Sequence, residues 1–115
     1  MPDIITPELV VTSAASTKNS NPEPGLTRRV GAYNEKLFLA EHNMEKGWVG
    51  AAHSHPHDQI VYVITGHLHV QCSGKTFELR TGDSFAVKGG VEHQASAIEA
   101  SHVIDVFTPR RDDYV

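Results

Sequence analysis

The sequence has little of what marks several large classes of protein. Its single cysteine, Cys72, cannot form a disulfide within the chain, which predicts a reducing compartment. No apolar stretch approaches the length that spans a bilayer, and no basic segment followed by a long apolar run opens the chain. Lysine and arginine are not clustered, and the formal net charge is -4. We therefore expect a cytoplasmic protein that binds neither nucleic acid nor membrane.

Length and composition favour one domain with a tail. With 115 residues, 39% of them hydrophobic, the chain can fill one modest core but not two. Residues 1–24 hold four of the six prolines and a middle rich in Ser, Thr and Asn, which resists a continuous helix or strand. Its apolar residues at 4–5 and 9–11 could pack on the domain or on a second subunit. We predict a tail over 1–24 and a domain over 25–115.

The domain is expected to be all-β, because it is rich in β-branched residues, punctuated by glycine and without helical periodicity. Turn signals separate nine expected strands, with Gly66 turning the fourth into the fifth: 26–33, 36–44, 49–55, 59–65, 67–73, 76–81, 84–88, 93–99 and 101–109. Many short strands at this spacing predict an antiparallel sandwich or barrel, and the jelly roll is the version that encloses a cavity.

Alternating histidines indicate a metal site. If residues 53–59 are extended, the side chains of His53, His55, His57 and Gln59 leave the same face. Imidazole nitrogens and an amide oxygen suit a borderline divalent metal, but one segment supplies only part of a coordination shell. The candidate for the remainder is His93, which follows a turn, a short apolar run and a Gly-Gly pair.

These two segments resemble the two motifs of the cupin superfamily. The matching residues are Gly47, His53, His55, Gln59 and Gly66 in the first motif, and Gly82, Lys88, Gly90, His93 and Ala97 in the second. Three identities depart from the family pattern, because Gln59 replaces Glu, Lys88 replaces Pro and Ala97 replaces Asn. The resemblance implies a cupin jelly-roll β-barrel, commonly a homodimer. It also implies one divalent metal ion (Zn, Ni, Mn or Fe) held by His53, His55, Gln59 and His93, with His57 outside the shell.

The end of the chain resembles a narrower group of cupins, the KdgF-type pectin-degradation proteins. Asp105, Phe107, Pro109 and Arg111 follow the D-x-F-x-P-x-R ending of that group, and the resemblance extends from about residue 26 to residue 115. It implies ring opening of 4,5-unsaturated monouronates, the sugar acids left by pectin and alginate lyases. In that reaction Asp105 would transfer a proton, Arg111 would bind the sugar carboxylate and Phe107 would shape the pocket.

The neutral charge of the implied ligands favours this chemistry. Three imidazoles and an amide leave the metal charge uncompensated, which suits a Lewis acid that attracts a carboxylate. Two other functions stay open: a cupin dioxygenase that uses a redox metal, and a module that binds a sugar acid without turnover.

The residues alone leave several side chains open as well. Asp105 lies between Ile104 and Val106 and could face either the interior or solvent. His67 and His69 also alternate but have no matching partner, so we expect an exposed or half-buried strand face. His42 and His102 have still less support as site residues.

Overall fold

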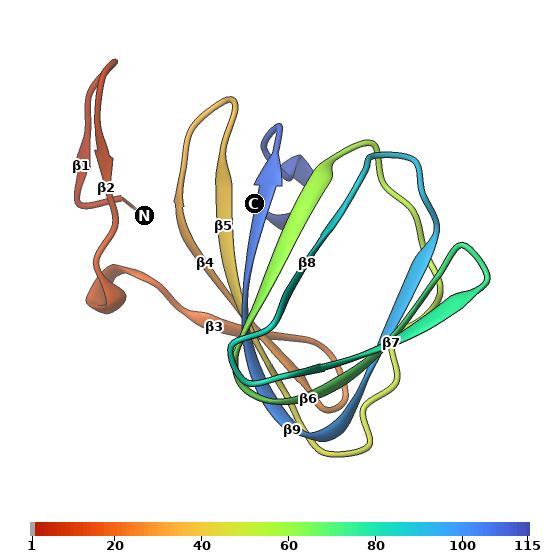
Figure 1. Ribbon diagram of the computed structural model, residues 1–115. Coiled ribbons are helices and arrows are strands. Elements are labelled where there is room, and N and C mark those ends of the chain that lie inside the picture. Colours follow the sequence, from red (N-terminus) through yellow and green to blue (C-terminus); the bar gives the residue numbers. More distant parts are fainter. Residues whose placement is uncertain (1) are drawn as a thin grey trace.

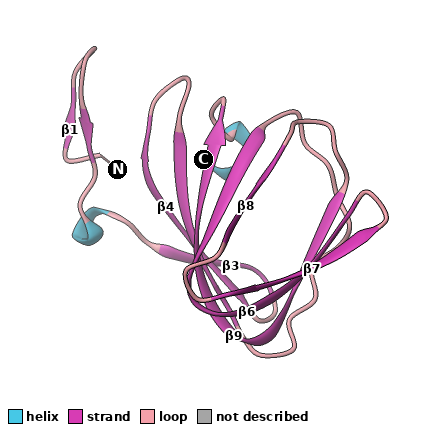
Figure 2. Cartoon of the chain, viewed as in Figure 1, coloured by secondary structure: helices cyan, strands magenta, loops and turns pink. Residues whose placement is uncertain are grey.

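The computed structural model describes residues 2–115, and nearly all of its regular structure is β-strand (Figures 1 and 2). The elements are β1 (Ile4–Ile5), β2 (Val10–Val11), η1 (Ala14–Ser16), β3 (Asn19–Glu23), β4 (Leu26–Tyr33), β5 (Phe38–Met44), β6 (Asp58–Cys72), β7 (Lys75–Arg80), β8 (Ser84–Val87), β9 (His93–Thr108) and η2 (Asp112–Tyr114). The predicted all-β jelly roll is confirmed. Among the described residues, no helix is long and apolar enough to cross a membrane.

Two long strands, β6 and β9, connect the layers of the barrel (Figure 1). They pair antiparallel along most of their length. The first half of β6 pairs with β8, whereas its second half pairs with β7. The second half of β9 pairs with β5, which is followed across the sheet by β4 and β3. Each long strand therefore has one half in one layer of the barrel and the other half in the second layer.

The structure corrects the prediction of separate strands on either side of Gly66. This glycine does not turn the chain; it lies inside β6, where its φ is +117° and the pairing with β9 shifts register on both sides. A Cβ at this position would lie 2.6 Å from the Cα of Ser101. Gly66 therefore allows a close crossing of β6 and β9 and a bend between the layers. The two expected strands at 93–99 and 101–109 are likewise one strand, β9.

The predicted strand over 49–55 is also wrong. Only Val49 and His53 form isolated bridges, with Ser96 and His93 of β9. The backbone N–H of Gly50 donates to Ala95 and that of His53 to His93, so this segment advances three residues while β9 advances two. The extra residue interrupts the alternation of side chains. Between His53 and β6 the chain forms no strand and bends at Pro56 and His57, so the histidines of 53–57 do not share the face of one strand.

The N-terminal segment is only partly a tail. β3 lies within residues 1–24 and pairs with the outer edge of β4, with a register shift between Ser20 and Glu23 at the position of Pro22. An edge strand tolerates proline at such an irregularity. Before β3, the β1–β2 hairpin lies at the side of the barrel beyond β4 in Figure 1, and Ile5 is 71% exposed. Ile4, Ile5 and Leu9 are exposed, whereas Val10 of β2 is half-buried and β2 contacts β4 of the barrel.

Alternate positions of the strands point inward and fill part of the barrel. The main cluster comprises Leu26, Met44, Val61, Val63, Leu68, Val70, Leu79, Ala97 and Val103. A smaller cluster consists of Phe38, Ala40 and Phe107. Between them, polar side chains line a cavity.

Candidate functional site

A cavity of about 340 Å³ lies inside the barrel. Its size falls within the range of about 300–1,000 Å³ that is usual for small-molecule sites. Its polar lining includes Arg28, His42, His53, Gln59, His93, Asp105 and Arg111, and its aromatic lining includes Trp48, Phe85, Phe107 and Tyr114. A few convergent polar groups in a partly apolar cavity are typical of a binding or catalytic site.

Three of the predicted metal ligands meet in this part of the barrel. Candidate ligand atoms of His53, His55 and His93 all lie within 4.8 Å of one another, and the ring centroids of His53 and His93 are 4.5 Å apart. The bridge between His53 and the first residue of β9 brings the two sequence segments together. These histidines can hold a metal ion.

The backbone sets the tautomer of each ring in this cluster. The Nδ1 atoms of His53, His55 and His93 lie 3.0, 2.9 and 2.9 Å from the carbonyl oxygens of Ala51, His57 and Val91. A carbonyl only accepts, so each Nδ1 carries the proton and each Nε2 keeps a lone pair. The Nε2 of His93 is buried without a hydrogen-bond partner among the described residues. Burial lowers the pKa of His55 and of His93, which favours the neutral ligand form.

Gln59 adds an oxygen to the cluster. Its Oε1 lies 2.9 Å from Nε2 of His55, while its Nε2 donates to Oδ1 of Asp105 over 2.8 Å. Two acceptors therefore oppose each other at His55, and reversing the amide would turn its oxygen toward the Asp105 carboxylate. A cation between the acceptors relieves this conflict. Three imidazole nitrogens and an amide oxygen thus fit a divalent first-row metal ion.

His57 has a different environment. Its Nε2 lies 3.2 Å from the carbonyl oxygen of Arg110 and donates to it, so the side chain is directed to the C-terminal segment. The ligand-capable cluster does not include it.

Asp105 faces the interior, which answers the question that the sequence left open. Only 4% of the residue is exposed, and it alternates on β9 with the buried Val103 and Phe107. Its carboxylate accepts one hydrogen bond from Gln59 and faces Nδ1 of His42 at 2.6 Å through its other oxygen. The predicted proton carrier therefore adjoins the predicted metal ligands.

Two residues that were not predicted for the site, His42 and Arg28, also line the cavity. Arg28 donates from Nε to Nε2 of His42 over 3.0 Å, and its guanidinium lies 3.5 Å from the centroid of the Tyr114 ring. A signal for His42 exists in the sequence, because it continues the alternation of Phe38, Ala40 and Met44, all buried along β5. No comparable pattern indicates the contact between Arg28 and Tyr114, which joins β4 to the end of the chain.

Arg111 packs against aromatic rings beside the cavity. Its guanidinium carbon lies 4.7 Å from the centroid of Phe107 and 4.0 Å from that of Tyr114. Nε and Nη2 donate to the carboxylate of Asp113, which lowers the pKa of Asp113 to about 2. Asp113 therefore occupies one edge of the guanidinium, and a ligand would use the end that carries Nη1.

His67 and His69 form a separate cluster outside the cavity. Both are bonded to Glu78 on β7, with 2.7 Å between Nε2 of His67 and the carboxylate. Their side chains are 19% and 29% exposed, so the expected half-buried strand face is confirmed. Glu78, on the neighbouring strand, is the partner of both histidines.

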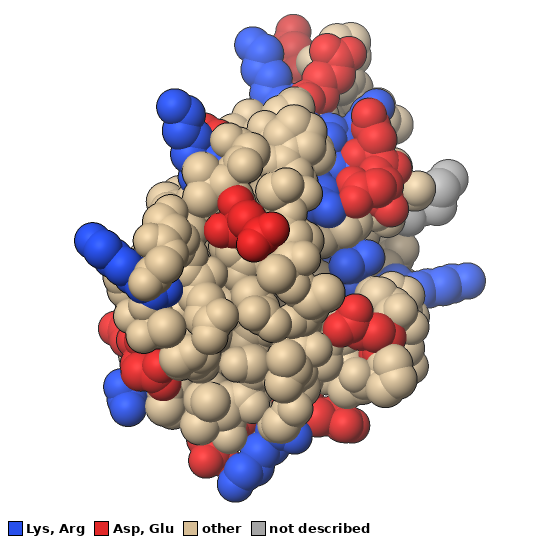
Figure 3. All heavy atoms as spheres, turned by 90° about the vertical axis from the view of Figure 1, so that its right-hand side faces the viewer, with Lys and Arg blue, Asp and Glu red and all other residues tan. Residues whose placement is uncertain are grey.

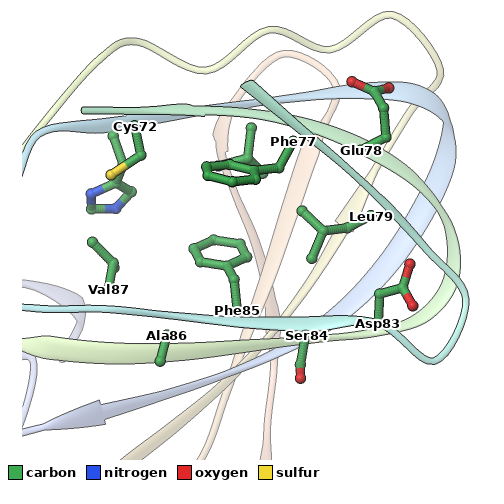
Figure 4. A pocket seen from close by; sticks show the side chains of 11 residues that line it. Cys72, Phe77, Glu78, Leu79, Asp83, Ser84, Phe85, Ala86 and Val87 are labelled. Atoms are coloured by element: carbon green, nitrogen blue, oxygen red, sulfur yellow. The ribbon is translucent and has the colours of Figure 1, made fainter. Parts of the chain in front are cut away.

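A second cleft, of about 450 Å³, opens between β7 and β8. Figure 4 shows Phe77 and Phe85 facing each other across it. Its acidic residues have partners elsewhere, because Glu78 binds the two histidines and Asp83 accepts from the backbone of Arg80. Figure 3 shows the side of the molecule near β7, where most of the surface is uncharged and both signs of charge are interspersed. His93 lines this cleft as well, but the other polar residues of the barrel cavity do not.

Comparisons with known proteins agree with this geometry. The model of the cupin domain matches residues 40–107. The pectin degradation protein KdgF of Dickeya dadantii (strain 3937) is 36% identical over 93 residues, which cover 79% of this chain and 84% of that protein. The structure of KdgF from Halomonas sp. is 36% identical, with a TM-score of 0.84 over 90% of this chain and 97% of that one. An RmlC-like cupin from Shewanella frigidimarina NCIMB 400 is 34% identical, with a TM-score of 0.85 over 90% of this chain and 93% of that one. The chain belongs to the cupin superfamily, and KdgF proteins of pectin degradation are among its relatives.

Proposed function

We propose that this cupin converts 4,5-unsaturated monouronates, released when lyases cut pectin or alginate, into linear 5-keto-4-deoxyuronates. The observation that carries the proposal is Asp105, a buried carboxylate beside three ligand-capable histidines in a cavity that Arg111 also lines. The relatives named for pectin degradation support the substrate class.

The reaction is an isomerisation that needs one proton carrier. The hydroxyl on C1 loses a proton as the bond from C1 to the ring oxygen breaks, which leaves an aldehyde at C1. The electrons of that bond stay on the ring oxygen, C4 gains a proton, and C5 becomes a ketone. Asp105 accepts two hydrogen bonds and therefore suits the ionised form that can take the hydroxyl proton and then deliver one to C4.

His53, His55, Gln59 and His93 would hold one divalent metal ion. When bound, the ion supplies Lewis acidity and attraction for an anion, because none of these four ligands cancels its charge. The lone pairs on the Nε2 atoms and the amide orientation of Gln59 are the features of the chain that prepare this site.

Arg111 and Phe107 would orient the sugar. The Nη1 end of the Arg111 guanidinium would bind the sugar carboxylate through a charge-assisted hydrogen bond. Phe107 lies under that guanidinium and within 5.7 Å of the His55 ring, measured between ring centroids, so it would form a wall of the substrate pocket.

We also propose that the protein is a cytoplasmic homodimer. Leu39, Val106 and Ile60 lie side by side across three strands and are at least 36% exposed, forming an apolar row on the sheet. A second copy would cover this row. Light scattering after gel filtration tests the dimer, and a mass of one chain at micromolar concentration would oppose it.

Steady-state kinetics on an unsaturated monouronate tests the proposed roles. Asp105→Asn removes the titratable group and is expected to lower kcat by about 100-fold or more, with little change in KM. Arg111→Ala is expected chiefly to raise KM, by about tenfold or more. An Asp105→Asn variant that retains its metal and the wild-type kcat would remove Asp105 from the mechanism.

A further inference from the structure

We propose that His42, held by Arg28, is a positioning residue that fixes the carboxylate of Asp105 for proton transfer. This inference rests on the proposed function for its catalytic meaning, but its structural part can be measured separately. It concerns two residues that lie outside the metal-ligand cluster and that reach the substrate chemistry through Asp105.

The hydrogen bonds leave one tautomer for His42. The Nε of an arginine only donates, so Nε2 of His42 must accept from Arg28. Nδ1 therefore carries the ring proton and donates it to Oδ2 of Asp105 over 2.6 Å. His42 is thus a neutral donor whose orientation is determined at both nitrogens.

The two oxygens of Asp105 are held from different strands. His42 on β5 binds Oδ2, and Gln59 on β6 binds Oδ1. Two donors fix both the position and the plane of the carboxylate, whereas a single donor would leave it free to rotate. Each oxygen keeps a second lone pair, and one of these can accept the substrate proton.

Arg28 is itself restrained. Its guanidinium lies 3.5 Å from the centroid of the Tyr114 ring, and Tyr114 also contacts the guanidinium of Arg111 at 4.0 Å. The same aromatic ring therefore supports the arginine that orients His42 and the arginine proposed to bind the sugar carboxylate. This arrangement connects the positioning of the proton carrier with the positioning of the substrate.

Packing alone does not explain a histidine at this place. His42 continues an inward-facing row with Phe38, Ala40 and Met44, where an apolar side chain would fill space without the cost of burying a polar ring. Among residues 2–115, the hydrogen-bond partners of the two His42 nitrogens are Arg28 and Asp105, so the ring connects these two charged groups.

The first measurement is the tautomer of His42, read by long-range nitrogen–proton NMR correlations on the metal-loaded protein at neutral pH. We expect the proton on Nδ1 in wild type, because Nδ1 faces the Asp105 carboxylate and Nε2 faces the Nε–H of Arg28. A proton on Nε2 in wild type would overturn the inference, whatever the substrate of the protein.

The second measurement compares His42→Leu with His42→Asn, whose side-chain nitrogen occupies the position of Nδ1. His42→Leu should lower kcat by about 10- to 100-fold, the usual effect of removing a partner that orients a site residue, with KM and metal content within about twofold of wild type. His42→Asn should recover most of kcat. His102→Leu, which removes a half-buried histidine outside the cavity, is the matched control.

The outcomes separate the two proposals. If wild type does not turn over a monouronate, the proposed function fails while the tautomer remains readable. If wild type turns over and His42→Leu keeps the wild-type kcat, or if His42→Asn is as slow as His42→Leu, the positioning role is wrong.

Discussion

Replacing Gln59 by glutamate tests the contact between Gln59, the proposed metal ligand, and Asp105, the proposed proton carrier. In wild type, Nε2 of Gln59 donates to Oδ1 of Asp105 over 2.8 Å. Gln59→Glu replaces this donor by a second carboxylate oxygen at the same place. Two unit charges 2.8 Å apart repel by about 6 kcal/mol at an effective dielectric constant of 20. The variant must therefore retain a proton between the two carboxyls or move them apart.

The expected loss of stability follows from these two routes. Losing a hydrogen bond to a charged group costs about 1.5–3 kcal/mol. Retaining a proton at pH 7 on a carboxyl that ordinarily ionises near pH 4 costs at most about 4 kcal/mol. We expect the metal-free variant to be about 1.5–4 kcal/mol less stable than wild type at pH 7. The loss should shrink as the pH falls toward 4, because the carboxyls of the unfolded chain then take up protons too.

Urea unfolding of the metal-free proteins between pH 4 and 8 is the assay. The double variant Gln59→Glu/Asp105→Asn is the matched control, because the amide of the second substitution can donate to the new carboxylate and restore stability. A loss that does not vary with pH, or that the second substitution does not relieve, would refute the reasoning. In the metal-loaded protein, Gln59→Glu should keep the metal and turn over a monouronate more slowly, since the added charge lowers Lewis acidity and repels the sugar carboxylate.

Three further predictions address the metal, the bend and the C-terminal ion pair. Elemental analysis should show one divalent ion per chain in wild type and in His57→Ala, and no bound ion in the double variant His53→Ala/His93→Ala. Retention of the ion in the double variant would mean that the metal binds elsewhere. Gly66→Ala should lower the free energy of unfolding in urea by about 2–5 kcal/mol, because the new Cβ would meet Ser101 and the residue has a positive φ. Gly74→Ala, also at positive φ but with open space around it, should lower it by only about 1–2 kcal/mol. Equal losses would contradict the close crossing of β6 and β9 at Gly66. Because Arg111 lowers the pKa of Asp113 from 3.8 to about 2, the pair stabilises the wild-type fold above about pH 4. Wild type should therefore be more stable than Asp113→Asn above about pH 4, and the difference should disappear as the pH falls from 4 to 2. A difference in stability that grows as the pH falls would contradict this assignment.

Local patterns in the sequence predicted much of the fold. The alternation and turn signals place β4 at residues 26–33, as observed, and the motif spacing names the three histidines that cluster. Gly66 was assigned to a turn because a glycine between two β-rich runs indicates a turn and a bend equally well. Only the approach of Ser101, 35 positions later in the chain, distinguishes them, and that contact has no local signal.

At the site, too, local patterns predicted some residues, whereas others depend on contacts between distant parts of the chain. His55 and Gln59 come together although the segment before β6 is bulged, so the predicted partners are right while the predicted strand is wrong. His42 was recoverable from the alternation along β5, but its importance depends on Asp105, which lies 63 residues away in sequence. Tertiary contacts of this kind decide which polar residues of a strand face become part of a site.

The central claim is that the barrel opens unsaturated monouronates with the help of a divalent metal. The most direct measurement follows the ultraviolet absorbance of such a monouronate, with the linear product identified by NMR, for metal-loaded and chelator-treated protein. We predict rapid loss of absorbance with the loaded protein, a rate near that of buffer alone after chelation, and no consumption of oxygen. Loss of absorbance no faster than in buffer, despite one bound metal per chain, would contradict the claim, and uptake of oxygen would point to a dioxygenase instead.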